Sequence, residues 1–195
     1  MEFGKLFELV IAASLINNFV FTRFLGLCIF FGVSKKMETS VGMSITFTAV
    51  MVVSAALSWV VYQYVMIPLD LTFLKIIIFI GVVAAFVQSA DTVMKKVSPT
   101  MYYKLGVYLA LITTNCIILA VPLINAGEHY NFFESMAFGL GSGIGFALAL
   151  LIMASIREKL EVADVPAPFR GLPIAFIIAG LIALAFTGFS GLITL

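Results

Sequence analysis

Residues 24–33 read FLGLCIFFGV, and residues 112–121 read ITTNCIILAV. In each stretch a cysteine, Cys28 or Cys116, is followed by isoleucine, two apolar residues, a small residue and valine. Both stretches lie within long apolar segments. A thiolate buried in hydrocarbon is costly unless its charge is compensated, as iron or zinc compensates it. Two thiolates do not complete a four-ligand site, so a metal-site interpretation also predicts further ligands from a partner subunit.

The composition indicates that the whole chain lies in a membrane. Of its 195 residues, 63% are hydrophobic and 11% are charged, and the mean hydropathy is +1.18. Soluble domains have roughly a quarter of charged residues. The formal net charge of +1 gives no basis for nucleic-acid binding. We therefore expect one all-α integral membrane domain over residues 1–195, with the lipid membrane as its surroundings.

Six apolar runs are each long enough to cross a bilayer as a helix, which takes about 20 residues. The runs cover residues 6–32, 41–66, 72–94, 104–126, 132–156 and 171–194. Most of the basic residues fall in the first, third and fifth connections between these runs, and the opposite side holds only Lys5 and Lys75. The positive-inside rule therefore predicts three cytoplasmic loops and both termini outside the cytoplasm. The basic residues of the three loops are Lys35, Lys36, Lys95, Lys96, Lys104, Arg157, Lys159 and Arg170.

The chain also reads as two similar halves. Residues 38–42 (ETSVG) resemble residues 134–139 (ESMAFG), and residues 79–86 resemble residues 178–186, in the same order as the two cysteine stretches. Three spans in each half give the second half the opposite orientation. The sequence thus predicts two inverted three-helix repeats, approximately 1–100 and 101–195. Alternatively, the two halves are similar only because apolar segments share the same composition.

Polar residues within the first and fourth spans predict that these two helices are discontinuous. Backbone groups freed at membrane depth need polar partners, and polar side chains there usually face the bundle interior. Breaks that meet near the pseudo-axis would bring the two cysteines together from opposite leaflets. Alternatively, the polar side chains bond neighbouring helices, and the cysteines are small buried apolar residues. The polar residues concerned are Asn17, Asn18, Thr22 and Arg23 in the first span and Thr113, Thr114 and Asn115 in the fourth.

Three further features are expected to have structural roles. Glu134, in the first turn of the fifth span, complements a helix N-terminus. Gly26, Gly32, Gly141, Gly143 and Gly145 are hinge or close-packing positions. Arg23 needs either a partner or an interruption of its span that lets its side chain reach water.

Several motifs make the sequence resemble the A subunits of Rnf electron-transport complexes over essentially its whole length. The E subunit of the sodium-pumping NADH:quinone reductase is also similar. That subunit typically has an acidic residue before the asparagine of the first span and a Pro-Pro in the last loop. Here Asn17 precedes Asn18, and residues 165–168 read VPAP, which favours the Rnf family. The matching motifs are FLGLC (24–28), GVSKK (32–36), LITTNC (111–116), NF (131–132) and ADVPAPFRG (163–171).

The resemblance implies a complex in the bacterial cytoplasmic (inner) membrane that links ferredoxin and NAD and exports Na⁺ or H⁺. It implies a homologous E subunit of opposite orientation as the partner, with Rnf subunits B, C, D and G completing the complex. The A and E subunits share one [2Fe–2S] cluster, and the ligands from this chain would be Cys28 and Cys116. No catalytic residue is expected in this chain itself. The alternative is a cofactor-free ion-transporting or scaffold membrane subunit.

Overall fold

The computed structural model describes residues 2–70, 72–97, 112 and 115–188, and the regular elements in these ranges are all helical. Among these described residues, three helical segments are long and apolar enough to cross a membrane: Met37–Met66, Thr72–Thr92 and Phe132–Val162. The helices Cys116–Gly127 and Leu172–Thr187 are apolar but shorter. The expected all-helical membrane fold is therefore confirmed for the part of the chain that the structure describes. The count of six spans and the inverted repeat stay predictions.

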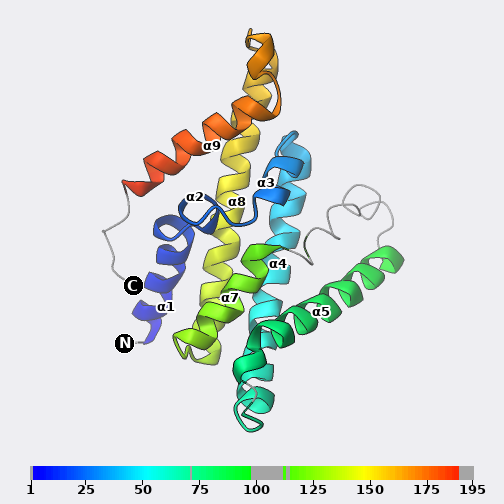
Figure 1. Ribbon diagram of the computed structural model, residues 1–195, viewed down its shortest axis with the longest axis vertical. Coiled ribbons are helices and arrows are strands. Elements are labelled where there is room, and N and C mark those ends of the chain that lie inside the picture. Colours follow the sequence, from blue (N-terminus) through cyan, green and yellow to red (C-terminus); the bar gives the residue numbers. More distant parts are fainter. Residues whose placement is uncertain (1, 71, 98–111, 113–114, 189–195) are drawn as a thin grey trace.

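Two antiparallel helices form the centre of the molecule (Figure 1). They are α4 (Met37–Val61), which continues into the π-helical turn η2 (Tyr62–Met66), and α8 (Phe132–Val162). The short 3₁₀ turn η3 (Thr72–Leu74) leads into α5 (Lys75–Val97).

The predicted first span is interrupted twice, as its polar residues indicated, and contains four helical elements. These are α1 (Glu2–Ile11), the π-helical turn η1 (Ala12–Ile16), α2 (Phe19–Thr22) and α3 (Leu27–Val33). The interruptions lie at residues 17–18 and 23–26.

The chain also leaves the helical conformation before the second cysteine. Asn115 has φ −71° and ψ 127°, which is extended backbone, and α7 (Cys116–Gly127) begins at the next residue. Most of the predicted fourth span before this point, together with Thr113 and Thr114, lies outside the described residues.

The outer helices pack on opposite sides of the central pair (Figure 1). Helix α5 contacts α7 and α4, whereas α9 (Leu172–Thr187), which follows the 3₁₀ turn η4 (Ala167–Phe169), contacts α2. Each outer helix therefore covers a short helix that belongs to the other half of the chain.

Glycines allow α8 to approach α4 closely. A Cβ atom added at Gly139 would lie 2.9 Å from Cβ of Ala55, and one added at Gly143 would lie 2.9 Å from Cγ2 of Thr48. Real Cβ atoms hardly ever come so close to a neighbour. The spacing of four residues places both glycines on one face of α8, which is the GxxxG pattern of close helix pairs.

A second glycine pair lines another face of α8. A Cβ atom at Gly141 would lie 2.7 Å from the carbonyl oxygen of Val10, and one at Gly145 would lie 2.9 Å from that of Ser14. Here the neighbour is the backbone of α1 and η1, which has no flexible side chain to move aside. The glycines of α8 are therefore close-packing positions.

The end of α8 holds the connection between α3 and α4. Nη1 of Arg157 donates hydrogen bonds to the carbonyl oxygen of Phe31 and to Oγ of Ser34, both at 2.9 Å. Oε1 of Glu158 accepts a 2.7 Å bond from the backbone N–H of Met37, the first residue of α4. These contacts satisfy a carbonyl at the end of one helix and an N–H at the start of the next.

The start of α8 is held in a similar way. Glu134 forms a capping box with Asn131, so its predicted role at this helix N-terminus is confirmed. Oε1 of Glu134 also pairs with Nζ of Lys5 on α1 at 2.7 Å. Nε1 of Trp59 donates a 2.8 Å bond to the carbonyl oxygen of Tyr130.

Replacing Gly145 by alanine is expected to destabilise the protein by about 1–3 kcal/mol, because the new methyl group overpacks a contact between two backbones. The measurement is the thermal unfolding midpoint of the purified full-length protein in detergent. Gly81→Ala on α5 is the matched control, since nothing lies within 4 Å of a Cβ there. Equal midpoints for the two variants would contradict the close approach.

Candidate functional site

The two cysteines lie in the first turns of two short helices that run in opposite directions. Cys28 is the second residue of α3, which has 7 residues, and Cys116 is the first of α7, which has 12. Helix α3 leads to the end of the bundle where α4 begins, and α7 leads to the end where α8 begins (Figure 1). These helices are about 10 and 18 Å long, so neither crosses a hydrocarbon core of about 30 Å. Both helix starts therefore lie within the bundle.

The two helix starts contact each other through the residues before the cysteines. A Cβ atom at Gly26, the N-cap residue of α3, would lie 2.7 Å from Cδ1 of Ile117 and 3.3 Å from Oδ1 of Asn115. Gly26 also has φ +75°, a left-handed conformation that glycine adopts without strain. Phe24, two residues earlier, has φ +53°. Positive φ at a bulky residue is strained, and such strain is concentrated at functional sites.

Both thiols face outward from the isolated chain. Cys28 and Cys116 are exposed, whereas the residue that follows each of them, Ile29 or Ile117, is completely buried. The structure therefore does not place the cysteines in the core of this chain. It places each cysteine at the surface, next to a buried core residue.

Helix α7 makes the surroundings of Cys116 favourable for negative charge. Its first turn presents backbone N–H groups, and the helix dipole adds partial positive charge at this end. Oδ1 of Asn115 accepts a 2.8 Å bond from the N–H of Ile117 and fixes the start of the helix. Helix N-termini of this kind stabilise thiolates.

A buried asparagine holds the interruption of the first span. Asn18 is completely buried, and its Nδ2 donates to the carbonyl oxygens of Ser14 at 3.2 Å and Gly145 at 2.8 Å. Its Oδ1 accepts a 3.1 Å bond from the N–H of Val20, and its carbonyl oxygen accepts a 2.7 Å bond from Oγ1 of Thr22. One side chain thus satisfies backbone groups that the break frees and ties the break to α8.

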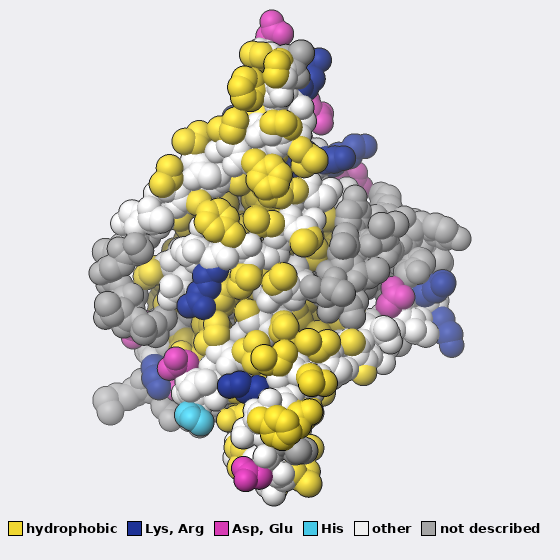
Figure 2. Space-filling model, viewed as in Figure 1, with side chains coloured by type: hydrophobic (Ala, Val, Ile, Leu, Met, Phe, Trp, Pro, Cys, Tyr) yellow, Lys and Arg dark blue, Asp and Glu magenta, His cyan; other side chains and the backbone are white. Residues whose placement is uncertain are grey.

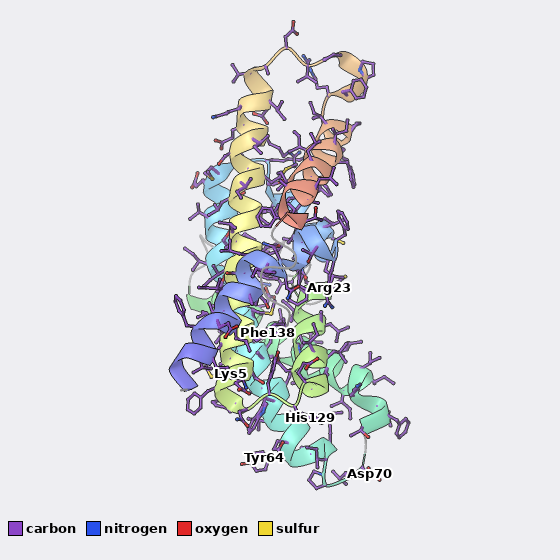
Figure 3. The ribbon with its side chains drawn as sticks, turned by 90° about the vertical axis from the view of Figure 1, so that its left-hand side faces the viewer. Lys5, Arg23, Tyr64, Asp70, His129 and Phe138 are labelled. Carbon is purple, nitrogen blue, oxygen red and sulfur yellow. The ribbon has the colours of Figure 1, made fainter. Side chains whose placement is uncertain are left out.

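Arg23 follows this break and lines a cavity of about 610 Å³. Its guanidinium carbon lies 5.7 Å from the ring centroid of Phe19, within cation–π range. Figure 3 shows Arg23 near the middle of the bundle, and Lys5 and His129, which also line the cavity, nearer the end where α8 begins. The sequence predicts that Arg23 needs either a partner or an interrupted helix. Arg23 has both: the ring of Phe19 is its partner, and the helix is interrupted at residues 23–26.

Tyr130 also lines this cavity, in the connection before α8. Its pKa is raised above the ordinary value, first by burial and then by the carboxylates of Glu128 and Glu134. The phenol therefore stays uncharged at neutral pH and acts as a neutral hydrogen-bonding group.

The structure brings together part of the region that the sequence indicated. The segment before Cys28, Asn115 and the residue after Cys116 are in contact, and Asn18 lies in the same broken span. Sequence reasoning missed Ser14 and the carbonyl group of Gly145 as partners of Asn18. The spacing of four residues between Ser14 and Asn18 is a signal for the first contact, whereas a backbone carbonyl on a distant helix leaves no trace in the sequence.

The fold and the site define a class of helical membrane protein. In this class the first span is interrupted, the start of its last helical element, α3, contacts the start of the short helix α7, and each of these two helix starts carries a cysteine. A family described as "Rnf-Nqr subunit, membrane protein" matches residues 6–193. The chain belongs to this Rnf-Nqr family.

Several curated relatives are similar over almost their whole length. The A subunit of the proton-translocating ferredoxin:NAD(+) oxidoreductase complex of Clostridium ljungdahlii is 55% identical over 187 residues, which cover 96% of this chain and 97% of the relative. The A subunit of the ion-translocating oxidoreductase complex is 51% identical in Psychromonas ingrahamii, with the same coverage of both chains. In Vibrio cholerae serotype O1 strain N16961 the protein of that name is 49% identical, again over 96% of this chain and 97% of the relative. The resemblance to the Rnf family is thus confirmed, and the relationship to the E subunit stays a prediction.

Substituting leucine for Asn18 is expected to destabilise the protein by roughly 2–4 kcal/mol, because several buried backbone groups lose their partners. The comparison is with Asn17→Leu, next to it at the same break, where the side chain lines the cavity. The measurement is the thermal midpoint of each purified variant. If both variants lose the same stability, the hydrogen-bond network of Asn18 is not what holds the break.

Proposed function

We propose that this chain is the A-type membrane subunit of an Rnf electron-transport complex, and that Cys28 and Cys116 supply half of the ligands of a [2Fe–2S] cluster. A homologous E subunit supplies the other half. The observation that carries the proposal is the contact between the starts of α3 and α7, with both thiols exposed beside it. The names of the curated relatives support the assignment to the complex.

The donor set fits half of such a cluster. A [2Fe–2S] centre takes four thiolates in its common form, and the sequence contains two cysteines. Within the described part of the chain, no three His, Cys, Asp or Glu residues come together as a metal-binding group. A partner that covers the exposed thiols would complete the ligand set and remove them from lipid.

The arrangement of helices supports the inverted repeat on which this partnership rests. The second helices of the two halves, α4 and α8, are antiparallel, and the short helices α3 and α7 also run in opposite directions (Figure 1). The last helices cross over, so that α5 contacts α7 and α9 contacts α2. A pseudo-two-fold axis in the membrane plane relates elements in this way.

When bound, an iron–sulfur cluster supplies one-electron transfer within the membrane. The residues of this chain determine its surroundings. The first turn of α7 stabilises negative charge, and the buried side chains next to the cysteines exclude water from one side. Asn18 fixes the broken span, so the segment that leads to Cys28 has a defined position. The complex as a whole, in the inner membrane and with subunits B, C, D and G, would carry out the reaction between ferredoxin and NAD and export Na⁺ or H⁺.

Serine at position 28 or 116 is expected to abolish one [2Fe–2S] signal of the complex, because a hydroxyl is a poor ligand for iron. The measurement is electron paramagnetic resonance of the dithionite-reduced, purified complex, with the polypeptide composition checked on a gel. Gly127→Ser serves as the control, since it adds a hydroxyl at the end of α7 where nothing lies within 4 Å. An unchanged spectrum in an intact complex would favour the cofactor-free ion-transporting or scaffold role.

The proposed orientation is tested by labelling introduced cysteines in right-side-out membrane vesicles. His129→Cys, in the connection before α8, is expected to react with a membrane-impermeant maleimide. Lys36→Cys, before α4, is expected to react only after permeabilisation, because positive loops stay in the cytoplasm. The wild-type complex gives the background from the two native cysteines. The reverse pattern would place both termini in the cytoplasm.

A further inference from the structure

A second cavity, of about 350 Å³, lies between the end of α8 and the start of α9. Two arginines line it: Arg157, on α8, and Arg170, just before α9. The carboxylate among the lining residues is that of Glu161. Glu161 also interacts electrostatically with Arg157, so the lining has two guanidinium groups against one carboxylate and positive charge is in excess.

The two guanidinium groups differ in how firmly they are held. Nη1 of Arg157 is fixed by its bonds to Phe31 and Ser34, which leaves its other nitrogens to donate elsewhere. Arg170 is exposed, and it forms no ion pair with a carboxylate of the described residues. One anchored and one available arginine form a clamp suited to an oxyanion.

The backbone at the start of α9 adds to this charge. Gly171 lines the cavity with φ +95°, and nothing lies within 4 Å of a Cβ there. The first turn of α9 receives no hydrogen bond from a side-chain cap, and its donors are the N–H groups of Leu172 and Ile174, because Pro173 between them has none. Free N–H groups at a helix N-terminus favour an anion, in addition to the two arginines.

The cavity lies where α8 leaves the apolar part of the membrane. With 31 residues α8 is about 46 Å long, which exceeds a hydrocarbon core of about 30 Å. Its apolar run ends just before Arg157. Figure 2 shows charged side chains gathered at this end of the molecule and hydrophobic side chains on the surface next to it. Phe169, Leu172 and Phe176, around the start of α9, are all exposed.

We propose that this cavity binds the phosphate of an anionic phospholipid on the cytoplasmic side of the membrane. The arginines and the start of α9 take the phosphate, and the apolar lining residues Leu160, Val165 and Ile174 contact the glycerol and the upper acyl chain. This mixed lining favours a lipid over free phosphate, and the depth along α8 matches a headgroup. Basic pockets between membrane helices on this side recognise anionic headgroups by the same physics.

The test uses the intact purified complex in nanodiscs that contain a photoactivatable phosphatidylglycerol. Mass spectrometry of the cross-linked peptides is expected to locate the lipid within residues 157–174. Arg170→Gln should lower the yield about fivefold, the worth of one basic residue near an anionic surface. Lys159→Gln, which removes an exposed charge of α8 outside the cavity lining, should leave the yield unchanged.

Four results would overturn the proposal. They are equal yields for Arg170→Gln and the wild type, equal yields with a photoactivatable phosphatidylcholine, full competition by inorganic phosphate, and cross-linking of the cavity to another protein of the complex in place of lipid. The third would indicate a free phosphate site, and the fourth a protein partner. Because neither cysteine takes part, the outcome is independent of the cluster assigned to Cys28 and Cys116.

Discussion

The close approach of α8 to the broken first span is the contact on which the rest of the structure depends. Because positions 141 and 145 have no side chain, the backbone of α1 and η1 lies directly against α8. That distance is what brings the carbonyl oxygen of Gly145 within 2.8 Å of Nδ2 of Asn18. A larger residue at position 145 would separate the helices and leave the amide group of Asn18 with one partner fewer. The close approach of the two backbones and the hydrogen bonds of Asn18 together stabilise the break in the span.

Fixing this break has consequences for the cysteines. The chain after Asn18 makes one short turn, α2, and then passes through Phe24 and Gly26, both with positive φ, before α3 begins. Such a path has few alternative conformations once both of its ends are held. One end is held by Asn18 on α8. The other is held by Arg157, which reaches the last turn of α3 from the far end of the same helix. Helix α8 therefore holds the segment that contains Cys28 from both sides.

Helix ends inside a membrane are unfavourable unless something uses their free backbone groups. Two such ends meet here, where Gly26 contacts Asn115 and Ile117. Spanning the membrane does not require two helix starts to meet. Their meeting has a chemical consequence when a negatively charged group lies there, because the N–H groups of the first helical turns stabilise the charge and lipid does not. The breaks and the exposed thiols thus agree with membership of a family in which curated relatives are subunits of oxidoreductase complexes.

The class of protein, the interruption of the first span and the residues that cause it can be read from the amino-acid sequence. A long apolar run is stable in a bilayer as a helix, and polar residues within the run indicate where the helix is interrupted. The motifs around Cys28 and Cys116, together with GVSKK, NF and ADVPAPFRG, indicate the family. Only the three-dimensional structure shows that the two helix starts touch and that both thiols face outward. It also shows that α8, through Gly145 and Arg157, holds the first span at two points. These facts depend on distances between backbones of separate helices, and a local sequence pattern carries no information about which carbonyl group on another helix will be within reach.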